Sequence, residues 1–242
     1  MKQIHFVLQG KGGVGKSFIS AILAQFIAKN SEVMCYDTDP VNQTFAAFKA
    51  LNVKHIPLIE KGASKIIERN FDTLVEDVLT ADNGIFVVDN GASTFVPMCN
   101  YIMENNLIEM LKESGVEVYI HTVITGGQAL NETLNGLASI FEKVSKDNVY
   151  VWLNHFFGLI EIKGKSFTDT NYFKEHKEQI KGVISIEQKN ADTFGIDIRN
   201  MLEQNLTFDE VQNDDSGFSI MAKQRLKQTQ KILFAELERC VA

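Results

Sequence analysis

A glycine-rich loop near the start of the chain carries the residues best suited to chemistry. Residues 10–17 read GKGGVGKS and fit the pattern G-x-x-x-x-G-K-[ST] without a mismatch. The loop follows an expected strand and opens an expected helix, which is the context that this pattern requires. Its glycines let successive backbone N–H groups point toward phosphate oxygens, and the helix N-terminus adds partial positive charge. In this interpretation Lys16 reaches the β- and γ-phosphates, and Ser17 binds Mg²⁺.

The same glycines fit a second pattern. Those at positions 10, 12 and 15 also spell G-x-G-x-x-G, which is typical of dinucleotide-binding proteins. An acidic residue after the second expected strand would then contact a ribose. This alternative leaves Lys16 and Ser17 without a role, whereas a phosphate-binding loop needs both of them. We therefore favour the phosphate-binding loop.

Three acidic residues stand directly after expected strands. Asp89 follows an apolar run, and in phosphate-loop enzymes an aspartate at this point holds Mg²⁺. Asp37 and Asp39 follow another apolar run, where acids beside a phosphate site either hold metal and water or turn away as turn formers. Gly91 comes two residues after Asp89, so its backbone N–H could approach the γ-phosphate.

The apolar pattern around these residues predicts an α/β fold. Short apolar runs alternate with amphipathic segments, which indicates a mostly parallel sheet with helices on both faces, in a single domain over residues 1–242. Strands are expected at 4–8, 33–36, 85–88, 116–123, 149–153 and 183–186. Helices are expected at 17–29, 44–51, 71–79, 107–111, 130–144 and 219–239. The pattern is weakest over 155–218, where 158–165 is expected to form a hairpin or an excursion.

Length and composition exclude several classes of protein. The 242 residues, 45% apolar and 23% charged, are typical of a globular chain and not of a disordered one. The longest apolar run, 149–153, is far shorter than the roughly 20 residues of a membrane helix, so we expect a cytoplasmic protein without an integral membrane segment. The net charge of −7 argues against a surface built for nucleic-acid backbones. Three widely spaced cysteines argue against a disulfide framework, a zinc ribbon and a shared iron–sulfur cluster.

Together these motifs resemble the ParA/MinD ATPases, whose phosphate loop is a deviant Walker A motif. Lys11, near the front of the loop, matches the signature lysine of that family. Segment 37–40 is similar to the family's second acidic motif, and segment 87–91 to its Walker B motif and second switch. Residues 125–137 and Asn154 agree more loosely. Within the family, the opening of the chain most resembles the TraL proteins of conjugative plasmids.

The resemblance implies a role for each matched residue. Lys11 would cross a dimer interface to the phosphates of the partner, Asp39 would orient the attacking water, and Asn154 would meet the adenine. The expected nucleotide-binding residues are Gly10, Gly12, Gly13, Val14, Gly15, Lys16, Ser17, Phe18, Gly91 and Asn154. The expected metal-binding residues are Ser17, Asp37 and Asp89, and the expected catalytic residues are Lys11, Lys16 and Asp39.

The resemblance also implies a P-loop NTPase fold and a slow ATPase that requires ATP and Mg²⁺. Its monomer would exchange with an ATP-sandwich homodimer, and it would serve plasmid transfer or maintenance with an unidentified protein partner. ATP is favoured over GTP because the sequence lacks a guanine-binding Asn-Lys-x-Asp motif. A nucleotide-holding adaptor with little turnover stays open as an alternative, because residues 90–92 depart from the family pattern. The expected last helix mixes acids with bases, so contact with DNA or with a membrane surface is not favoured.

Overall fold

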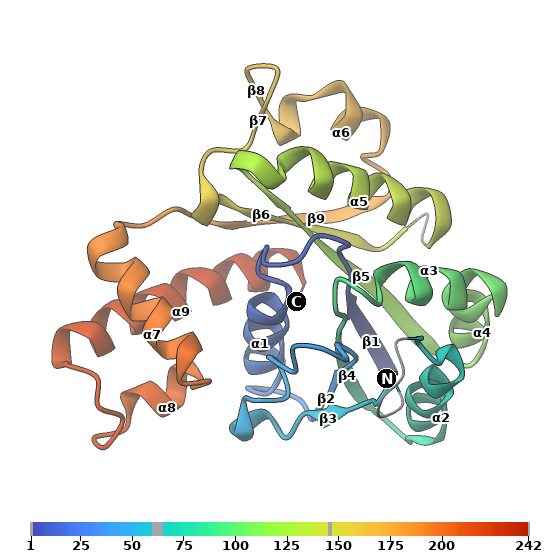
Figure 1. Cartoon of the computed structure of the whole chain (residues 1–242), viewed down its shortest axis with the longest axis horizontal. Helices are drawn as coiled ribbons and strands as arrows, with labels where there is room; N and C mark the ends of the chain where they lie inside the picture. Colours follow the sequence, from blue (N-terminus) through green and yellow to red (C-terminus); the bar gives the residue numbers. More distant parts are fainter. Residues whose placement is uncertain (1, 60–64, 145–146, 242) are drawn as a thin grey trace.

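The computed structural model describes residues 2–59, 65–144 and 147–241 (Figure 1). Its strands are β1 (Lys2–Val7), β2 (Val33–Asp37), β3 (Lys54–His55), β4 (Gly84–Asp89), β5 (Val116–Thr125), β6 (Val149–Asn154), β7 (Glu161–Ile162), β8 (Lys165–Ser166) and β9 (Ile180–Ile186). Its α-helices are α1 (Lys16–Ile27), α2 (Asp72–Thr80), α3 (Phe95–Glu104), α4 (Leu107–Glu113), α5 (Leu130–Lys143), α6 (Asn171–Glu175), α7 (Ile196–Glu203), α8 (Phe208–Gln212) and α9 (Ile220–Cys240). Met1 and Ala242, the ends of the expected single domain, lie outside the described residues.

A seven-stranded sheet forms the centre of the molecule. Its order is β3-β2-β4-β1-β5-β6-β9, and every neighbouring pair is parallel. The chain builds one side of β1 with β2, β3 and β4 and the other side with β5, β6 and β9, so the carboxyl end of β1 lies where the strand order reverses. In open α/β sheets such a point forms a crevice where ligands bind. The predicted parallel α/β fold is confirmed.

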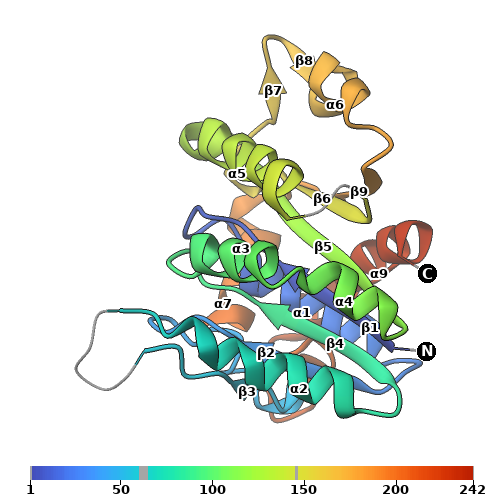
Figure 2. The ribbon, with the colours of Figure 1, turned by 90° about the vertical axis from the view of Figure 1, so that its right-hand side faces the viewer.

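Helices cover both faces of the sheet, as predicted (Figures 1 and 2). Helices α2 to α5 pack on one face, around Phe86 and Ile120, and α1 packs with α7, α8 and α9 on the other, around Trp152. The hairpin β7–β8 and α6 lie on the outer side of α5 (Figure 2). His176, directly after α6, stacks on Phe141 of α5 and so connects this segment to the helix. Across the described ranges, no helix is both long and apolar enough to cross a membrane.

The helix predicted over residues 44–51 is wrong. Residues 44–47 form turns, and only Lys49–Leu51 form a short 3₁₀ helix. Phe45 and Phe48 are buried at helical spacing, which explains the prediction. The Asp37 carboxylate accepts a hydrogen bond from Ala46 N at 2.9 Å, so this N–H is directed to a side chain instead of a carbonyl four residues back.

Helices α3, α6, α7 and α8 were not predicted from the sequence. α6 and α8 have five residues each, too few for a periodic pattern. The start of α8 nevertheless carries a readable mark, because Thr207 and Glu210 form a capping box. Contacts with the rest of the fold stabilise such short helices, and a sequence pattern does not encode those contacts.

Two histidines lie buried on neighbouring strands, beneath the face covered by α1 and α9. Trp152 Nε1 donates to His121 Nδ1 at 3.0 Å, so the His121 proton sits on Nε2, 2.9 Å from His5 Nδ1. His5 Nε2 then carries a proton, and it has no hydrogen-bond partner in the described part of the chain. Burial, aided by the charge of Lys181, lowers the pKa of His5 to about 3, and burial likewise lowers that of His121. Both rings are therefore neutral in the folded protein near pH 7.

We expect acid to destabilise the protein through these rings. A histidine in the unfolded chain has a pKa of about 6.5. Below that pH the unfolded chain therefore binds protons that the folded chain does not bind, which favours unfolding. His5 alone should lower the free energy of unfolding by about 2 kcal/mol between pH 7 and pH 5. Urea unfolding of wild type and His5→Phe at both pH values measures this, because contributions common to both proteins cancel. An equal pH dependence in the two proteins would contradict the assignment.

Candidate functional site

The phosphate loop lies between β1 and α1, at the point where the strand order reverses. Gly13 and Gly15 have φ values of 74° and 102°, a region that other residues adopt only with strain. Gly15 precedes the first residue of α1, and none of the described side chains caps this helix. The first backbone N–H groups of a helix have no partner within the helix, and the dipole adds positive charge there. The loop and the start of α1 therefore form an anion-binding site.

Lys16 folds back onto its own loop. Its Nζ donates to Lys11 O at 3.0 Å, and the residue is only 8% exposed. Burial lowers the pKa of Lys16, while the nearby carboxylates of Asp89 and Asp39 raise it. The ammonium group thus lies inside the loop, where it can exchange a carbonyl oxygen for a phosphate oxygen.

Asp89, at the end of β4, is held by two serines of α1. Ser17 Oγ donates to Asp89 Oδ2 at 2.6 Å, and Ser20 Oγ donates to Asp89 Oδ1 at 2.8 Å. Burial raises the pKa of Asp89 to about 7, with a contribution from the charge of Asp37, although both serine bonds oppose this shift. Hydroxyl and carboxylate oxygens are ligands that Mg²⁺ accepts, and Mg²⁺ sites in nucleotide enzymes combine one or two carboxylates with substrate phosphates. Ser17 and Asp89 therefore fit the expected metal.

Asp37 was expected to bind metal, but both of its carboxylate oxygens accept hydrogen bonds from the backbone. It is fully buried, and its two oxygens accept from Asp39 N at 2.8 Å and from Ala46 N at 2.9 Å. Burial raises its pKa, and these two backbone bonds act in the opposite direction. In this conformation Asp37 shapes the turn after β2, and a direct metal bond would require it to release a backbone partner.

Asp39 lies across the carboxyl end of β4. A Cβ atom on Gly91 would come within 2.6 Å of Asp39 Cγ, so only a glycine fits beneath this carboxylate. Asp39 Oδ1 accepts from Val41 N at 2.9 Å and from Asn42 N at 3.1 Å, which is turn-forming behaviour. Its Oδ2 accepts no hydrogen bond within the described residues. One oxygen of Asp39 thus supports the turn, while the other is available to a ligand.

Lys11 pairs with a residue of its own chain. Its Nζ lies 2.7 Å from Glu132 Oε2 in the first turn of α5, and both side chains are more than a third exposed. The pair is therefore a surface contact of the kind that is worth about 0–1 kcal/mol.

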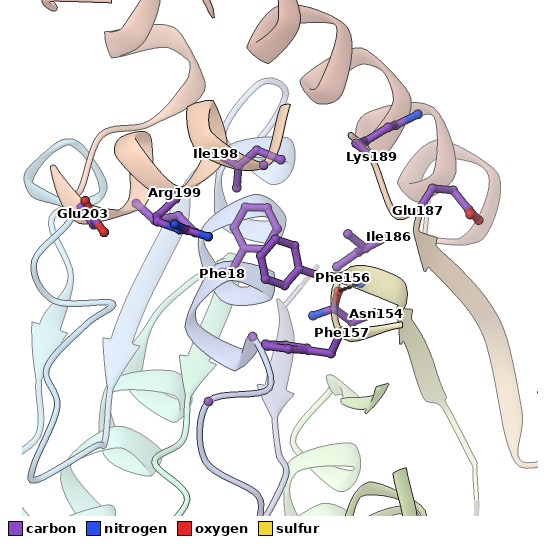
Figure 3. Close-up of a pocket in the computed structure, with 14 residues that line it drawn as sticks. Phe18, Asn154, Phe156, Phe157, Ile186, Glu187, Lys189, Ile198, Arg199 and Glu203 are labelled. Atoms are coloured by element: carbon purple, nitrogen blue, oxygen red, sulfur yellow. Dashed lines mark hydrogen bonds between the residues drawn. The ribbon is translucent and has the colours of Figure 1, made fainter. Parts of the chain in front are cut away.

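Two adjoining cavities open beside the loop. One, of about 550 Å³, is lined by Lys16, Ser17 and Asp39 among others. The other, of about 410 Å³, has mainly apolar walls (Figure 3). In Figure 3, Phe18 of α1, Phe156 of the turn after β6 and Ile198 of α7 gather around the same space. Residues common to both cavities are Gly13, Gly15, Phe18 and Leu202.

Asn154 lines the apolar cavity and also supports the loop. Its Nδ2 donates to Val14 O at 3.0 Å, and its Oδ1 accepts from Phe156 N at 3.1 Å. A Cβ atom on Gly15 would lie 3.0 Å from Asn154 Nδ2, so the contact with the loop is close. Asn154 therefore joins the end of β6 to the phosphate loop, a role that sequence reasoning missed.

The arrangement of loop, acids and sheet is that of a known family. The model described as the CobQ/CobB/MinD/ParA nucleotide binding domain matches residues 5–202. This chain belongs to that family. Among its relatives is protein TraL of Escherichia coli. The two sequences are 44% identical over 240 residues, which is 98% of each chain. The predicted resemblance to ParA/MinD and TraL proteins is therefore confirmed.

Solved structures with the same fold agree with this membership. The MinC:MinD cell division complex of Aquifex aeolicus matches with a TM-score of 0.56 and 14% identity, covering 96% of both chains. A plasmid partition protein of Borrelia burgdorferi bound to AMPPNP matches with a TM-score of 0.52 and 17% identity, covering 99% of this chain and 100% of that one. At such low identity these matches show the shared CobQ/CobB/MinD/ParA fold alone.

Sequence reasoning missed most of the apolar cavity. Phe18 was expected at the nucleotide, but Phe156, Ile186 and Ile198 were not, and α7 was not predicted at all. No spacing in the sequence marks these residues, because they come from three separate segments. The one available sign was the aromatic pair Phe156 and Phe157, two and three residues after Asn154, and both are about half exposed beside the cavity.

Proposed function

We propose that this protein is an ATP-binding, slowly hydrolysing molecular switch of the ParA/MinD type. The pair of adjoining cavities carries this proposal. The cavity beside Lys16 is the more polar of the two and is lined by the loop, which suits phosphates, and the apolar cavity suits a purine base. Gly13, Gly15 and Phe18 form a wall common to both, so one molecule with a base and a phosphate chain could fill them together.

The residues of this chain divide the binding among themselves. Backbone N–H groups of the loop and of α1 donate to phosphate oxygens, and Lys16 exchanges its bond to Lys11 O for a phosphate oxygen. Ser17 and Asp89 would hold Mg²⁺, which when bound would neutralise phosphate charge. Asp39 accepts a hydrogen bond from the attacking water through its available oxygen.

The switch would consist of a dimer that forms with ATP. Lys11 sits at the front of the loop, and its ammonium group makes an exposed contact with Glu132 of the same chain. Because such a pair is weak, Lys11 can leave it and reach the phosphates of a second copy. We propose that the dimer acts in the cytoplasm, in plasmid transfer or maintenance, through a protein partner. Contact with DNA is not part of the proposal.

Calorimetry and phosphate release test the proposal together. We expect calorimetry to detect ATP binding that Mg²⁺ strengthens, and phosphate release to proceed slowly. A nucleotide-holding adaptor, the second candidate, is favoured by the unusual residues 90–92 after the Walker B motif. It would bind ATP equally well but release no phosphate above background. Absence of ATP binding would contradict both functions.

Replacing Asp39 by asparagine should abolish turnover while ATP binding persists. The asparagine oxygen can still accept from Val41 N and Asn42 N, so the turn is kept and only the charge is lost. Loss of a water-orienting base typically costs about 10²–10⁴-fold in rate. Steady-state phosphate release, with calorimetry on the same samples, measures the two effects separately.

A matched control is Asp82→Asn, which removes an exposed carboxylate away from the site. It should hydrolyse ATP at the wild-type rate. If Asp39→Asn also turns over at that rate, Asp39 is only a turn former.

A further inference from the structure

A buried glutamine stands directly before the phosphate loop. Gln9 is fully buried, and its side-chain amide is satisfied from both ends. Its Oε1 accepts from Gly10 N at 2.9 Å. Its Nε2 donates to Val123 O at 2.9 Å and to Thr133 O at 3.1 Å, and it lies 3.3 Å from Thr122 Oγ1. Burying an amide is costly unless its hydrogen bonds are made, so these partners hold the side chain in one orientation.

The amide of Gln9 connects three segments that are remote in the sequence. Gly10 is the first residue of the loop, Val123 belongs to β5, and Thr133 lies in the first turns of α5. The same turns of α5 carry Glu132, which pairs with Lys11 of the loop. The position of α5 and the front of the loop are therefore coupled through one buried side chain.

Gly136 of α5 leaves room for this amide. A Cβ atom on Gly136 would lie 1.9 Å from Gln9 Oε1 and 2.6 Å from its Cδ, so no larger residue fits while the amide stays in place. Side-chain ends can usually move away from such a clash. Here any movement would break the bonds to Gly10 N and to the carbonyls of Val123 and Thr133.

We propose that Gln9 is a positioning residue for nucleotide binding, and that Gly136 is the residue that allows it. By holding Gly10 N, Gln9 fixes the direction in which the loop leaves β1. The following amides and Lys16 then face the phosphates without first having to order the loop. Gln9 touches no ligand itself, so it acts only through the loop, and the inference rests on the nucleotide binding proposed above.

The test compares nucleotide affinity in variants that are fully folded at the temperature of the measurement. Gly136→Ala should weaken binding of ATP with Mg²⁺ about tenfold, because the displaced amide no longer holds the loop. Gln9→Asn alone should also weaken binding, since its shorter side chain cannot reach all partners. In the double variant the shorter amide leaves room for the added methyl group, so the combined loss should be smaller than the product of the two single losses.

Gly182→Ala in β9 is the matched control. Its added methyl group would crowd Tyr150 and Cys240 at 3.1–3.2 Å, which stresses the fold away from the loop. It should lower the melting temperature yet change ATP affinity by less than about twofold. If Gln9 contributes to stability alone, Gly136→Ala should likewise lower the melting temperature and leave ATP affinity nearly unchanged. That result would overturn the inference.

If Gly136→Ala does not fold, Gln9→Met decides the question. Methionine keeps the volume and removes the polar amide, so it should bind ATP about tenfold more weakly if Gln9 positions the loop. Wild-type affinity in this variant would overturn the inference. Failure of the wild-type protein itself to bind ATP would instead contradict the proposed function, so the two failures are distinct.

Discussion

Replacing Lys16 by alanine should weaken ATP binding on the order of 100-fold, the largest loss of nucleotide affinity that we expect from one substitution. The ammonium group is nearly buried inside the phosphate loop, where it donates a hydrogen bond to Lys11 O. Exchange of that carbonyl for a phosphate makes a charge-assisted bond in a site shielded from water, which alanine cannot replace. Calorimetry with ATP and Mg²⁺ measures the loss.

The fold should survive this change, because Lys16 lies at the first position of α1 and alanine favours a helix. Circular dichroism at the measuring temperature verifies that the variant is folded. Lys49→Ala, which removes an exposed lysine away from the loop, is the matched control and should bind ATP normally. Unchanged affinity in Lys16→Ala would remove the assignment of the phosphate loop.

Lys11→Ala should prevent the nucleotide-dependent dimer and still bind ATP. Within one subunit Lys16 would already bind the phosphates, so Lys11 would be needed only for those of the partner. Light scattering with a non-hydrolysable ATP analogue should find a dimer for wild type and a monomer for the variant. A variant that dimerises as readily as wild type would show that Lys11 does not act across the interface.

The contact between Lys11 and Glu132 adds a second measurement to this experiment. If Lys11 must leave Glu132 before it reaches the partner, Glu132→Gln should dimerise at up to about fivefold lower analogue concentration, because an exposed pair is worth at most about 1 kcal/mol. Glu142→Gln, an exposed glutamate near the other end of α5, is the control and should behave like wild type. No shift in Glu132→Gln would indicate that the contact does not restrain Lys11.

Features that depend on neighbours along the chain could be predicted without the structure. The phosphate loop is recognisable because its glycines, Lys16 and Ser17 must follow one another at set spacings to bend the backbone around phosphate. The central strands are recognisable because strands buried on both faces carry continuous apolar runs, which end at polar residues such as Asp37 in β2 or Asp89 in β4. Because these strands alternate with amphipathic helices, the sequence predicts a parallel sheet covered by helices.

The spacing of apolar residues predicted the wrong structure where a side chain took a backbone hydrogen bond away from a helix. Residues 44–51 have helical spacing of buried phenylalanines, but Asp37, on the preceding strand, takes the N–H of Ala46. Helix α7 lines the apolar cavity. It was not predicted, because its many charged and polar residues hide the apolar spacing by which a helix is recognised in a sequence. In both segments the deciding interactions join residues that only the folded chain brings together.

Tertiary structure alone decided which residues meet at the site. Asn154 supports the loop through Val14, and Gln9 occupies the space left by Gly136 on α5. Lys11 has its partner, Glu132, on that same helix. These contacts span more than a hundred residues of chain, and a hydrogen bond or a close approach depends on positions within a few tenths of an ångström. Spacing along one segment carries no such information, because packing of the whole sheet and its helices sets the distance between remote segments.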